Sequence, residues 1–355
     1  MWGDIAIAFL LAFITAFVIT PYTMRLAKKV GAIDIPDARR VNKEPMPRLG
    51  GIAVISGFFV STIYLIITMI IEQKVDFQVD REYIIKLLGF FCGIIVITAV
   101  CFIDDARGVH PLVKLAGQLI AAIIVVICGV KIEDIGIPIL EENQILTYII
   151  TIGWIVGIIN AINLIDGLDG LSSGVSLISC LSLLIIFSLK GRTIWPILLI
   201  TAVAGGIVGF LPYNFNPAKT FIGDTGSNFL GYALAVISIL GVAKTYTAVV
   251  IIAPLVVLGL PIFDTLFAIV RRLIKGRSFK AILVPDKGHL HHRLMAKGYT
   301  QKQSVLILYG ISATLGMFAI ILLESGIWKA ISFAMIIVAI IAIGYKDMFN
   351  IKKED

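Results

Sequence analysis

Continuous apolar runs, each long enough for a membrane-spanning helix, repeat along this chain and are separated by short polar segments. A helix needs roughly 17–25 mostly apolar residues to cross the hydrocarbon core of a bilayer. A transmembrane β-barrel would instead show short segments that alternate apolar and polar residues. The pattern therefore predicts an all-α polytopic membrane protein with eleven spans. The predicted spans are residues 5–23, 49–71, 84–103, 112–130, 145–160, 171–189, 194–211, 228–243, 248–270, 304–323 and 328–345.

The composition agrees with a membrane protein and gives no sign of a second domain. Of the 355 residues, 59% are hydrophobic and only 15% are charged, and the mean hydropathy is +0.99. We expect one integral-membrane domain over residues 1–355. The N-terminus has no basic leader and no small-residue cleavage site, so residues 5–23 are expected to be a retained helix rather than a signal peptide. The four Cys lie inside apolar runs without C-x-x-C spacing, which predicts neither a disulfide framework nor a zinc site.

Lys and Arg are concentrated in alternate connections between the predicted spans. One set of connections holds 22 of the 30 basic residues, and the other set holds 8. Basic connections face the cytoplasm, so the N-terminus is expected outside and the C-terminus inside. With this orientation the polar clusters all fall at cytoplasmic helix ends. These clusters are Asp104–Asp105, Asn160–Gly170, Asn214–Ser227 and His289–Arg293.

The segment Asn160–Leu171, N-A-I-N-L-I-D-G-L-D-G-L, carries two carboxylates at the end of an apolar run. Carboxylates in such a position are costly and indicate a function. If the segment is helical, Asp166 and Asp169 lie on one face. Gly167 and Gly170 would let the backbone bend or approach a ligand closely. The alternative is a polar turn between two membrane helices.

The pair Asp104–Asp105 ends the third predicted span. Adjacent carboxylates at a membrane boundary suit either Mg²⁺ binding or proton transfer. Neighbouring residues on a helix do not share a face, so one could address a metal and the other a substrate group. A simple helix stop signal is the alternative. Lys114, just inside the next span, offers a cation that could meet a phosphate.

The segment Arg39–Gly51, R-R-V-N-K-E-P-M-P-R-L-G-G, combines basic residues with two Pro and a Gly pair. Such a loop is able to bind phosphate, with Lys43 and Arg48 as the side chains to test. An ordinary positive-inside loop is the alternative.

The segment Asn214–Ser227 is rich in ligand-type side chains and precedes a predicted helix. Gly223 and Gly226 flank Asp224 and Thr225, and a helix N-terminus offers free N–H groups to a phosphate. Phe221 could stack on a base, or it could belong to the apolar core.

Three of the four His fall within five residues, in His289–Arg293. The spacing does not fit a helical zinc motif, and no Cys is near. Together, His and Arg suit a pyrophosphate in transfer, whereas a solvated basic loop is the alternative. Asp264 could pair with an Arg or line the cavity, and Pro261 is expected to break the helix there.

These clusters together predict phosphate chemistry at the cytoplasmic face, with a membrane lipid as donor or acceptor. A transporter of anionic sugars or nucleotides is a rival, but transporters place their polar site near the midplane in repeated halves. No repeated halves are visible here. A non-catalytic scaffold would have no need for an Asp pair beside the membrane.

The chain resembles a known family, the polyprenyl-phosphate N-acetylhexosamine-1-phosphate transferases, over nearly its whole length. The residues that carry the resemblance are P-R-L-G-G at 47–51, D-D at 104–105, N-x-x-N-x-x-D-G-x-D-G-L at 160–171, N-x-x-P-A-x-x-F-x-G-D-T-G-S at 214–227 and H-L-H-H-R at 289–293. The branch that makes peptidoglycan lipid I has P-T-M-G-G and a triple His in the corresponding places. This chain is more similar to the branch that uses UDP-GlcNAc for teichoic acid, O-antigen (lipopolysaccharide) or related glycans. Another UDP-N-acetylhexosamine, or a muramoyl-pentapeptide donor, is the alternative.

The resemblance implies transfer of GlcNAc-1-phosphate from UDP-GlcNAc to undecaprenyl phosphate, with release of UMP and a requirement for Mg²⁺ or Mn²⁺. It also implies a bacterial cytoplasmic membrane location, a possible homodimer and no nucleic-acid partner. The metal ligands it implies are Asp224 and Asn163. Asp104, Asp105, Asp166, His291 and His292 are the implied catalytic groups. Lys43, Lys114, Asp169, Asn214, Phe221, Ser227 and Arg293 are the implied substrate-binding residues.

The expected mechanism is in-line attack of a lipid phosphate oxygen on the β-phosphorus of the nucleotide sugar. Asp104 is a candidate to remove a proton from the lipid phosphate. That step is optional, because a phosphate monoester with a second pKa near 6 is mostly dianionic at pH 7. A two-step route through an aspartyl-phosphate is the rival.

Overall fold

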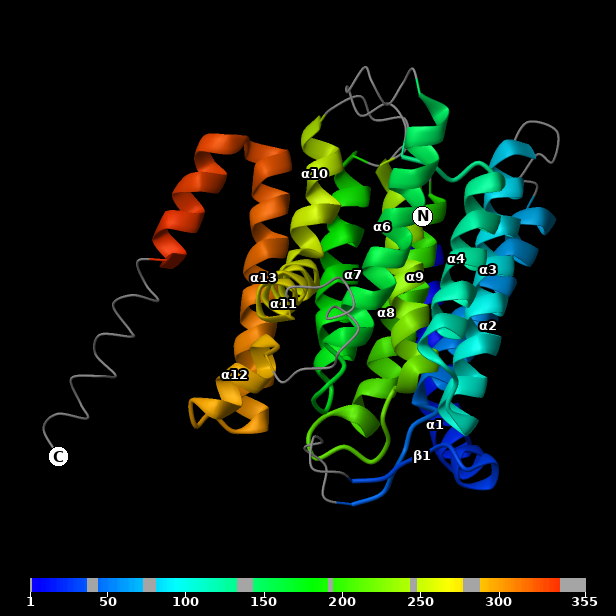
Figure 1. The fold of residues 1–355 in the computed structure, drawn as a ribbon. Coiled ribbons are helices and arrows are strands. Elements are labelled where there is room, and N and C mark those ends of the chain that lie inside the picture. Colours follow the sequence, from blue (N-terminus) through cyan, green and yellow to red (C-terminus); the bar gives the residue numbers. More distant parts are fainter. Residues whose placement is uncertain are drawn as a thin grey trace, which may run out of the picture.

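The protein is an all-α, multi-pass membrane protein, seen here in a computed structural model (Figure 1). The structure describes residues 2–36, 44–72, 81–132, 143–190, 194–242, 248–276 and 288–338. Within these residues, seven helices are long and apolar enough to cross a membrane. Large apolar side chains such as Leu10, Ile95 and Ile149 are half or more exposed on the outer faces. Such faces are stable against lipid and would be costly in water.

The seven long apolar helices run along a common bundle. They are α1 (Trp2–Val30), α2 (Gly50–Ile71), α3 (Arg81–Arg107), α6 (Gln144–Leu164), α7 (Leu171–Lys190), α8 (Trp195–Asn214) and α13 (Gln301–Ser325). The other helices are α4 (Pro111–Ile127), α9 (Gly223–Val242), α10 (Ala248–Val257), α11 (Gly259–Gly276), α12 (Leu290–Ala296) and an apolar segment, Ile327–Val338. Two-residue strands β1 (Ile33–Asp34) and β2 (Met46–Pro47) pair antiparallel at one end of the bundle.

Helix α9 is the centre of the bundle. It contacts α2, α3, α6, α7 and α8, and its side chains from Thr225 to Leu240 are buried. Around it, α1 packs on α2 and α8, α3 packs on α4, and α7 packs on α13. Small residues allow these close approaches. A Cβ on Gly231, for example, would come within 2.5 Å of the Ile159 Cα on α6.

The predicted start of α9 is wrong by five residues, because this helix begins at Gly223 rather than at residue 228. The first helical N–H groups lack partners within their own helix. Here the Asp105 carboxylate accepts from the N–H groups of Asp224 and Thr225, at 3.0 and 2.8 Å. The capping group comes from α3, far away in the sequence. The Asp–Thr pair therefore lies in the first turn of the helix rather than in a loop before it.

The predicted span 248–270 is two helices, α10 and α11, which meet at Leu258. Pro261 was expected to break a helix here, and the break falls just before it, because Pro261 has no N–H to donate to the Val257 carbonyl at the end of α10. Pro261 itself lies in the first turn of α11, where a proline is tolerated because the first N–H groups have no acceptor within their own helix.

Candidate active site

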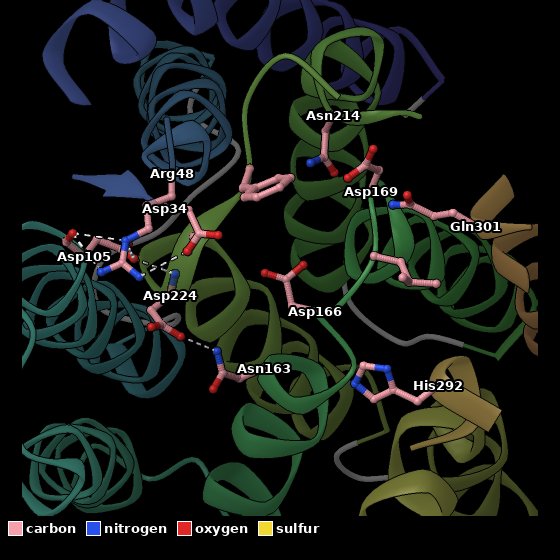
Figure 2. A pocket seen from close by; sticks show the side chains of 14 residues that line it. Asp34, Arg48, Asp105, Asn163, Asp166, Asp169, Asn214, Asp224, His292 and Gln301 are labelled. Atoms are coloured by element: carbon pink, nitrogen blue, oxygen red, sulfur yellow. Dashed lines mark hydrogen bonds and ion pairs between the residues drawn. The ribbon is translucent and has the colours of Figure 1, made fainter. Parts of the chain in front are cut away.

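A cavity of about 310 Å³ lies at the end of the bundle that carries β1 and α12 (Figures 1 and 2). Its walls come from the C-terminal ends of α3, α6 and α8 and from the N-terminal ends of α9 and α13. The lining residues are Asp34, Arg48, Asp105, Asn163, Asp166, Gly167, Leu168, Asp169, Asn214, Phe221, Gly223, Asp224, His292 and Gln301. All five polar clusters singled out in the sequence contribute at least one residue to this wall.

Three side chains from three helices meet at the Asp224 carboxylate. Lys114 on α4 donates to Asp224 Oδ1 at 2.6 Å, and Asn163 on α6 donates to the same oxygen at 2.5 Å. Lys114 also donates to Asn163 Oδ1 at 3.3 Å. We call Lys114, Asn163 and Asp224 the charged triad. Ser227, one turn along α9, is fully buried behind it and accepts a bond from Asn163 at 2.9 Å.

The two members of the Asp pair are used differently. Asp105 is 1% exposed, and besides the two backbone N–H groups of α9 it accepts from Thr225 Oγ1 at 2.6 Å. Asp104 accepts from the Val109 N–H at 2.9 Å and lies 3.5 Å from Lys114 Nζ. Asp105 therefore joins α3 to α9, whereas Asp104 extends the charged triad. The catalytic role predicted for each stays a prediction.

Arg48 joins the β1–β2 end of the molecule to the C-terminus of α3. Its guanidinium donates to the Asp105 carbonyl at 3.0 and 3.1 Å and to the Asp104 carbonyl at 3.3 Å. It also lies 3.9 Å from the buried carboxylate of Asp34. A cation at a helix C-terminus meets unsatisfied carbonyls and the negative end of the dipole.

Asp166 projects into the middle of the cavity, between the charged triad and His292 (Figure 2). Its carboxylate accepts from Ser172 Oγ at 2.9 Å. Burial raises the pKa of Asp166 to about 7, and the charges of Asp224 and Asp105 add to the rise. A carboxyl group whose pKa lies near neutrality is suited to exchange a proton.

Asp169, Asn214 and Phe221 form another part of the wall, and Figure 2 shows Asp169 and Asn214 side by side, away from Asp224 and Asp105. Asp169 accepts from the Asn216 side chain at 2.9 Å and from the Ala218 N–H at 3.1 Å. Asn214 is held by Ser173 and by the Thr220 carbonyl. This part has an aromatic ring, a carboxylate and an amide, which is a set able to hold a polar ring system.

The His segment reaches the cavity through only one of its rings. His292 lines the wall, whereas His291 is buried. A Cβ on Gly167 would lie 2.4 Å from His291 Nε2, so the imidazole packs on the Gly167 backbone. Burial lowers the pKa of His291 to about 3, and the neighbouring imidazoles add to the effect. His291 is thus neutral and lies behind the wall, and its predicted direct role gains no support from this position.

Asp264 pairs with a histidine, whereas the sequence left open an Arg partner or a place in the cavity wall. Its carboxylate lies 2.8 Å from His289 Nδ1 and accepts from the Leu290 N–H at 2.8 Å. It therefore fixes the start of α12, which carries His292. Arg293, on the same short helix, lies over the ring of Phe267 at 4.8 Å and does not line the cavity. Lys43 lies outside the described residues.

Two cavity residues, Asp34 and Gln301, were not identified as site residues from the sequence. Asp34 follows the end of α1, and Gln301 opens α13 after the cap at Thr300. A carboxylate just after a membrane helix was a usable signal for Asp34. Gln301 carries no such signal, because an amide is common at the start of a helix.

The donor set fits a hard cation. Asp224, Asn163 and Asp166 offer oxygen ligands to the cavity, and hard oxygen donors match Mg²⁺. Within the described residues, no group of three or more His, Cys, Asp or Glu is placed to hold an ion by itself. Mg²⁺ is usually bound by one or two carboxylates together with substrate phosphates and water.

Comparison with known proteins gives one consistent family. A model for glycosyl transferase family 4 matches residues 87–242. The chain is 39% identical to a probable undecaprenyl-phosphate N-acetylglucosaminyl 1-phosphate transferase of Bacillus subtilis, over 94% of this chain and 89% of the relative. It is 33% identical to a decaprenyl-phosphate N-acetylglucosaminephosphotransferase of Mycolicibacterium smegmatis, over 95% and 87% of the two chains. It is 28% identical to an undecaprenyl-phosphate α-N-acetylglucosaminyl 1-phosphate transferase of Haemophilus influenzae, over 90% and 86%. The chain belongs to the polyprenyl-phosphate N-acetylhexosamine-1-phosphate transferases of glycosyl transferase family 4.

Proposed function

We propose that this enzyme transfers GlcNAc-1-phosphate from UDP-GlcNAc to undecaprenyl phosphate, yielding undecaprenyl-pyrophosphoryl-GlcNAc and UMP. This would be the first membrane step in the synthesis of a cell-envelope glycan, such as a teichoic acid or an O-antigen. The observation that carries the proposal is the meeting of Asn163 and Asp224, which line a cavity at the end of a membrane bundle, with Lys114, which donates to both of them. The names of the relatives support the same donor and acceptor.

The nucleotide end of the donor is assigned to the wall of Asp169, Asn214 and Phe221. An aromatic ring can stack on a base, and a carboxylate or amide can read its polar edge. The pyrophosphate then lies toward the charged triad. Lys114 supplies a cation, and Arg48 and His292 supply further donors at the rim of the cavity.

Asp224 and Asn163 are the groups proposed to hold Mg²⁺, or Mn²⁺ in its place. Bound there, the cation would polarise the phosphoryl oxygens and take up charge as the pyrophosphate bond breaks. Asp224 is already oriented for this by Lys114 and Asn163. Lys114 would keep the carboxylate ionised when the cation is absent.

In the reaction, an oxygen of the lipid phosphate attacks the β-phosphorus of UDP-GlcNAc. The bond from that phosphorus to the bridging oxygen breaks, and UMP leaves. A dianionic lipid phosphate needs no base. Asp104 or Asp166 would serve only a lipid phosphate that arrives protonated.

The acceptor is a lipid, so the cavity should open at a bilayer face. We infer that this is the cytoplasmic face of a bacterial inner membrane, with eleven spans in one domain, an external N-terminus and an internal C-terminus. The distribution of Lys and Arg supports this orientation. Reporter fusions at the two termini would test it, because an internal N-terminus or an external C-terminus contradicts the assignment.

The test is turnover by the purified protein in detergent with undecaprenyl phosphate and Mg²⁺. UDP-GlcNAc, UDP-GalNAc and UDP-MurNAc-pentapeptide are compared, and both UMP and the lipid product are measured. Lipid product from UDP-GlcNAc, abolished by EDTA, is expected. Turnover of only another donor would refute the sugar assignment, and the absence of any lipid product would refute the reaction.

The one-step route has a separate test. Labelled UMP should not exchange into UDP-GlcNAc in the absence of lipid acceptor, because no enzyme-bound phosphate forms. Acceptor-independent exchange would instead support the aspartyl-phosphate route. Light scattering of the detergent complex would report whether the enzyme is a homodimer.

A further inference from the structure

Three amide side chains form a buried network one helical turn deeper in the bundle than the charged triad. Gln118 on α4 donates to Asn228 Oδ1 on α9 at 2.8 Å and accepts from Asn160 Nδ2 on α6 at 2.7 Å. Gln118 also donates to Asn160 Oδ1 at 3.5 Å. Two more bonds run along single helices, from Asn160 to the Val156 carbonyl and from Asn228 to the Asp224 carbonyl, both at 2.8 Å. We call Gln118, Asn160 and Asn228 the amide network.

The amide network and the charged triad use the same three helices. Gln118 follows Lys114 by four residues on α4, Asn160 precedes Asn163 by three on α6, and Asn228 follows Asp224 by four on α9. Residues three or four apart lie on the same helix face, one turn from each other. Helices α6 and α9 therefore present Asn163 and Asp224 to the cavity, and α4 places Lys114 against Asp224. Each of the three helices carries one amide a turn beneath its triad member.

Amides at this depth are costly unless they are fully bonded. Gln118 and Asn228 are 1% and 0% exposed, in helices whose other buried residues are mostly apolar. An unpaired amide in such surroundings loses several kcal/mol relative to water. The network therefore favours one rotation and one axial position of α4, α6 and α9.

We propose that Gln118, Asn160 and Asn228 are positioning residues that set the geometry of Lys114, Asn163 and Asp224. Loss of the network would let α4 shift relative to α9, and the triad would lose its 2.5–2.6 Å contacts. Partners that lie behind metal ligands typically change metal affinity or activity about 10–100-fold when they are removed. The wall of Asp169, Asn214 and Phe221 belongs to α8 and to the loops around it, so nucleotide binding should depend little on the network.

The test compares Gln118→Met with Ser61→Ala in the full-length protein in detergent. Gln118→Met keeps the length of the side chain and removes its bonds to both partners. Ser61→Ala is the matched control, because Ser61 is also fully buried and donates across a helix contact, to Ala8 of α1 at 2.8 Å. It lies far along α2 from the cavity. Calorimetry measures Mn²⁺ binding in the presence of UMP, and thermal unfolding is recorded in parallel.

We expect Gln118→Met to weaken Mn²⁺ binding about tenfold and to keep UMP affinity. Its melting shift should be larger than that of Ser61→Ala, because two buried amides lose a partner. In turnover assays, kcat should fall and the KM for UDP-GlcNAc should stay close to the wild-type value. Wild-type Mn²⁺ affinity in Gln118→Met would overturn the proposal. The proposal would also be overturned if Mn²⁺ affinity fell in proportion to the melting shift in both Gln118→Met and Ser61→Ala, or if the wild type did not bind Mn²⁺.

If Gln118→Met does not fold, Asn160→Leu provides the same test, because Asn160 is only half-buried and its loss leaves the Gln118–Asn228 bond intact. A smaller loss of Mn²⁺ affinity is then expected, and no loss overturns the proposal. The turnover readout alone rests on the proposed function. A wild type that binds Mn²⁺ and UMP without transferring sugar phosphate would refute that function and leave the binding test intact.

Discussion

Asp166 faces the cavity with one short hydrogen bond, from Ser172, and with the carboxylates of Asp224 and Asp105 near it. Lys114 opposes their effect only in part. A carboxyl group in this setting binds its proton more tightly in the folded protein than in the unfolded chain. It therefore makes the stability of the metal-free protein depend on pH.

The sign of this dependence follows from the two pKa values. The pKa of Asp166 is about 7 when folded and 3.8 in the unfolded chain. Between those values the folded state holds more protons, so the contribution of Asp166 to stability falls as pH rises from about 4 to 7. Asn does not titrate in this range, so Asp166→Asn should not show this fall in stability.

The melting temperature of Asp166→Asn, without metal or nucleotide, should therefore match the wild type at pH 5 more closely than at pH 8. At pH 8 the variant should be the more stable protein. Ser172→Ala keeps the carboxylate and should show no such gain. A difference in melting temperature that does not change with pH, or that favours the wild type at pH 8, would show that the pKa of Asp166 is not raised in the folded protein.

Several site residues could be identified from the sequence for a simple reason: they are polar groups in an apolar chain. Asp224, Asn163, Asp166 and Asp169 all stand at the ends of apolar runs. Their partners could not be predicted in the same way. Asp105 has the same appearance in the sequence as Asp104, yet its carboxylate is taken up by the start of α9. His291 and His292 are adjacent, yet the ring of His291 is buried against Gly167 and the ring of His292 lines the cavity.

The start of α9 depends on a close approach that only glycine allows. Gly223 has φ +71°, and a Cβ there would lie 2.0 Å from the Arg48 carbonyl oxygen and 2.8 Å from Asp105 Oδ2. Gly223→Ala should therefore destabilise the fold by about 1–3 kcal/mol and displace Asp224. We expect a lower melting temperature together with loss of transfer activity.

Gly153→Ala is the matched control for this change. Gly153 lies within α6, where a Cβ would meet nothing within 4 Å, so alanine there should be neutral or mildly stabilising. Equal melting temperatures and equal transfer activities in Gly223→Ala and Gly153→Ala would contradict the role of Gly223 at the start of α9.

Helix α12 is too short to be stable alone and depends on Asp264 of α11. Asp264→Leu removes the acceptor for His289 and for the Leu290 N–H. Hydrogen exchange at residues 290–296 should then become faster, since the first turn is no longer fixed. Transfer activity should fall as His292 loses its place.

Glu82→Gln is the control for Asp264→Leu. It alters an exposed i,i+4 pair with Lys86 near the start of α3. Exchange in α12 should be unchanged by it. Unchanged hydrogen exchange in Asp264→Leu as well would show that Asp264 does not fix the start of α12.

The positions of most helices followed from apolar runs, but the start of α9 did not. It needs a carboxylate from α3, so it is set by a tertiary contact rather than by the local sequence. The break between α10 and α11 has a local cause, because Pro261 has no N–H to donate to the Val257 carbonyl. Pattern-based reading therefore locates spans better than it locates the residues at their ends.

Across the whole protein, segments separated by up to 267 residues contribute to one cavity, from Asp34 to Gln301. Membrane helices bring this about because their polar ends must leave the hydrocarbon together. The central helix α9 carries Asp224 in its first turn, and helices α2, α3, α6, α7 and α8 pack around α9 (Figure 1). The arrangement accounts for a site that serves a soluble donor and a lipid acceptor at one face.

The most direct test of this account is lipid-product formation from UDP-GlcNAc and undecaprenyl phosphate by the wild type, Asp224→Asn and Ser61→Ala, at saturating Mg²⁺. Asp224→Asn keeps the shape of the side chain and removes the charge at the centre of the triad. We predict at least about a 10²-fold loss of kcat in Asp224→Asn, with wild-type rates in Ser61→Ala and a folded variant by melting. Retention of wild-type kcat in Asp224→Asn would contradict the assignment of this cavity as the catalytic centre.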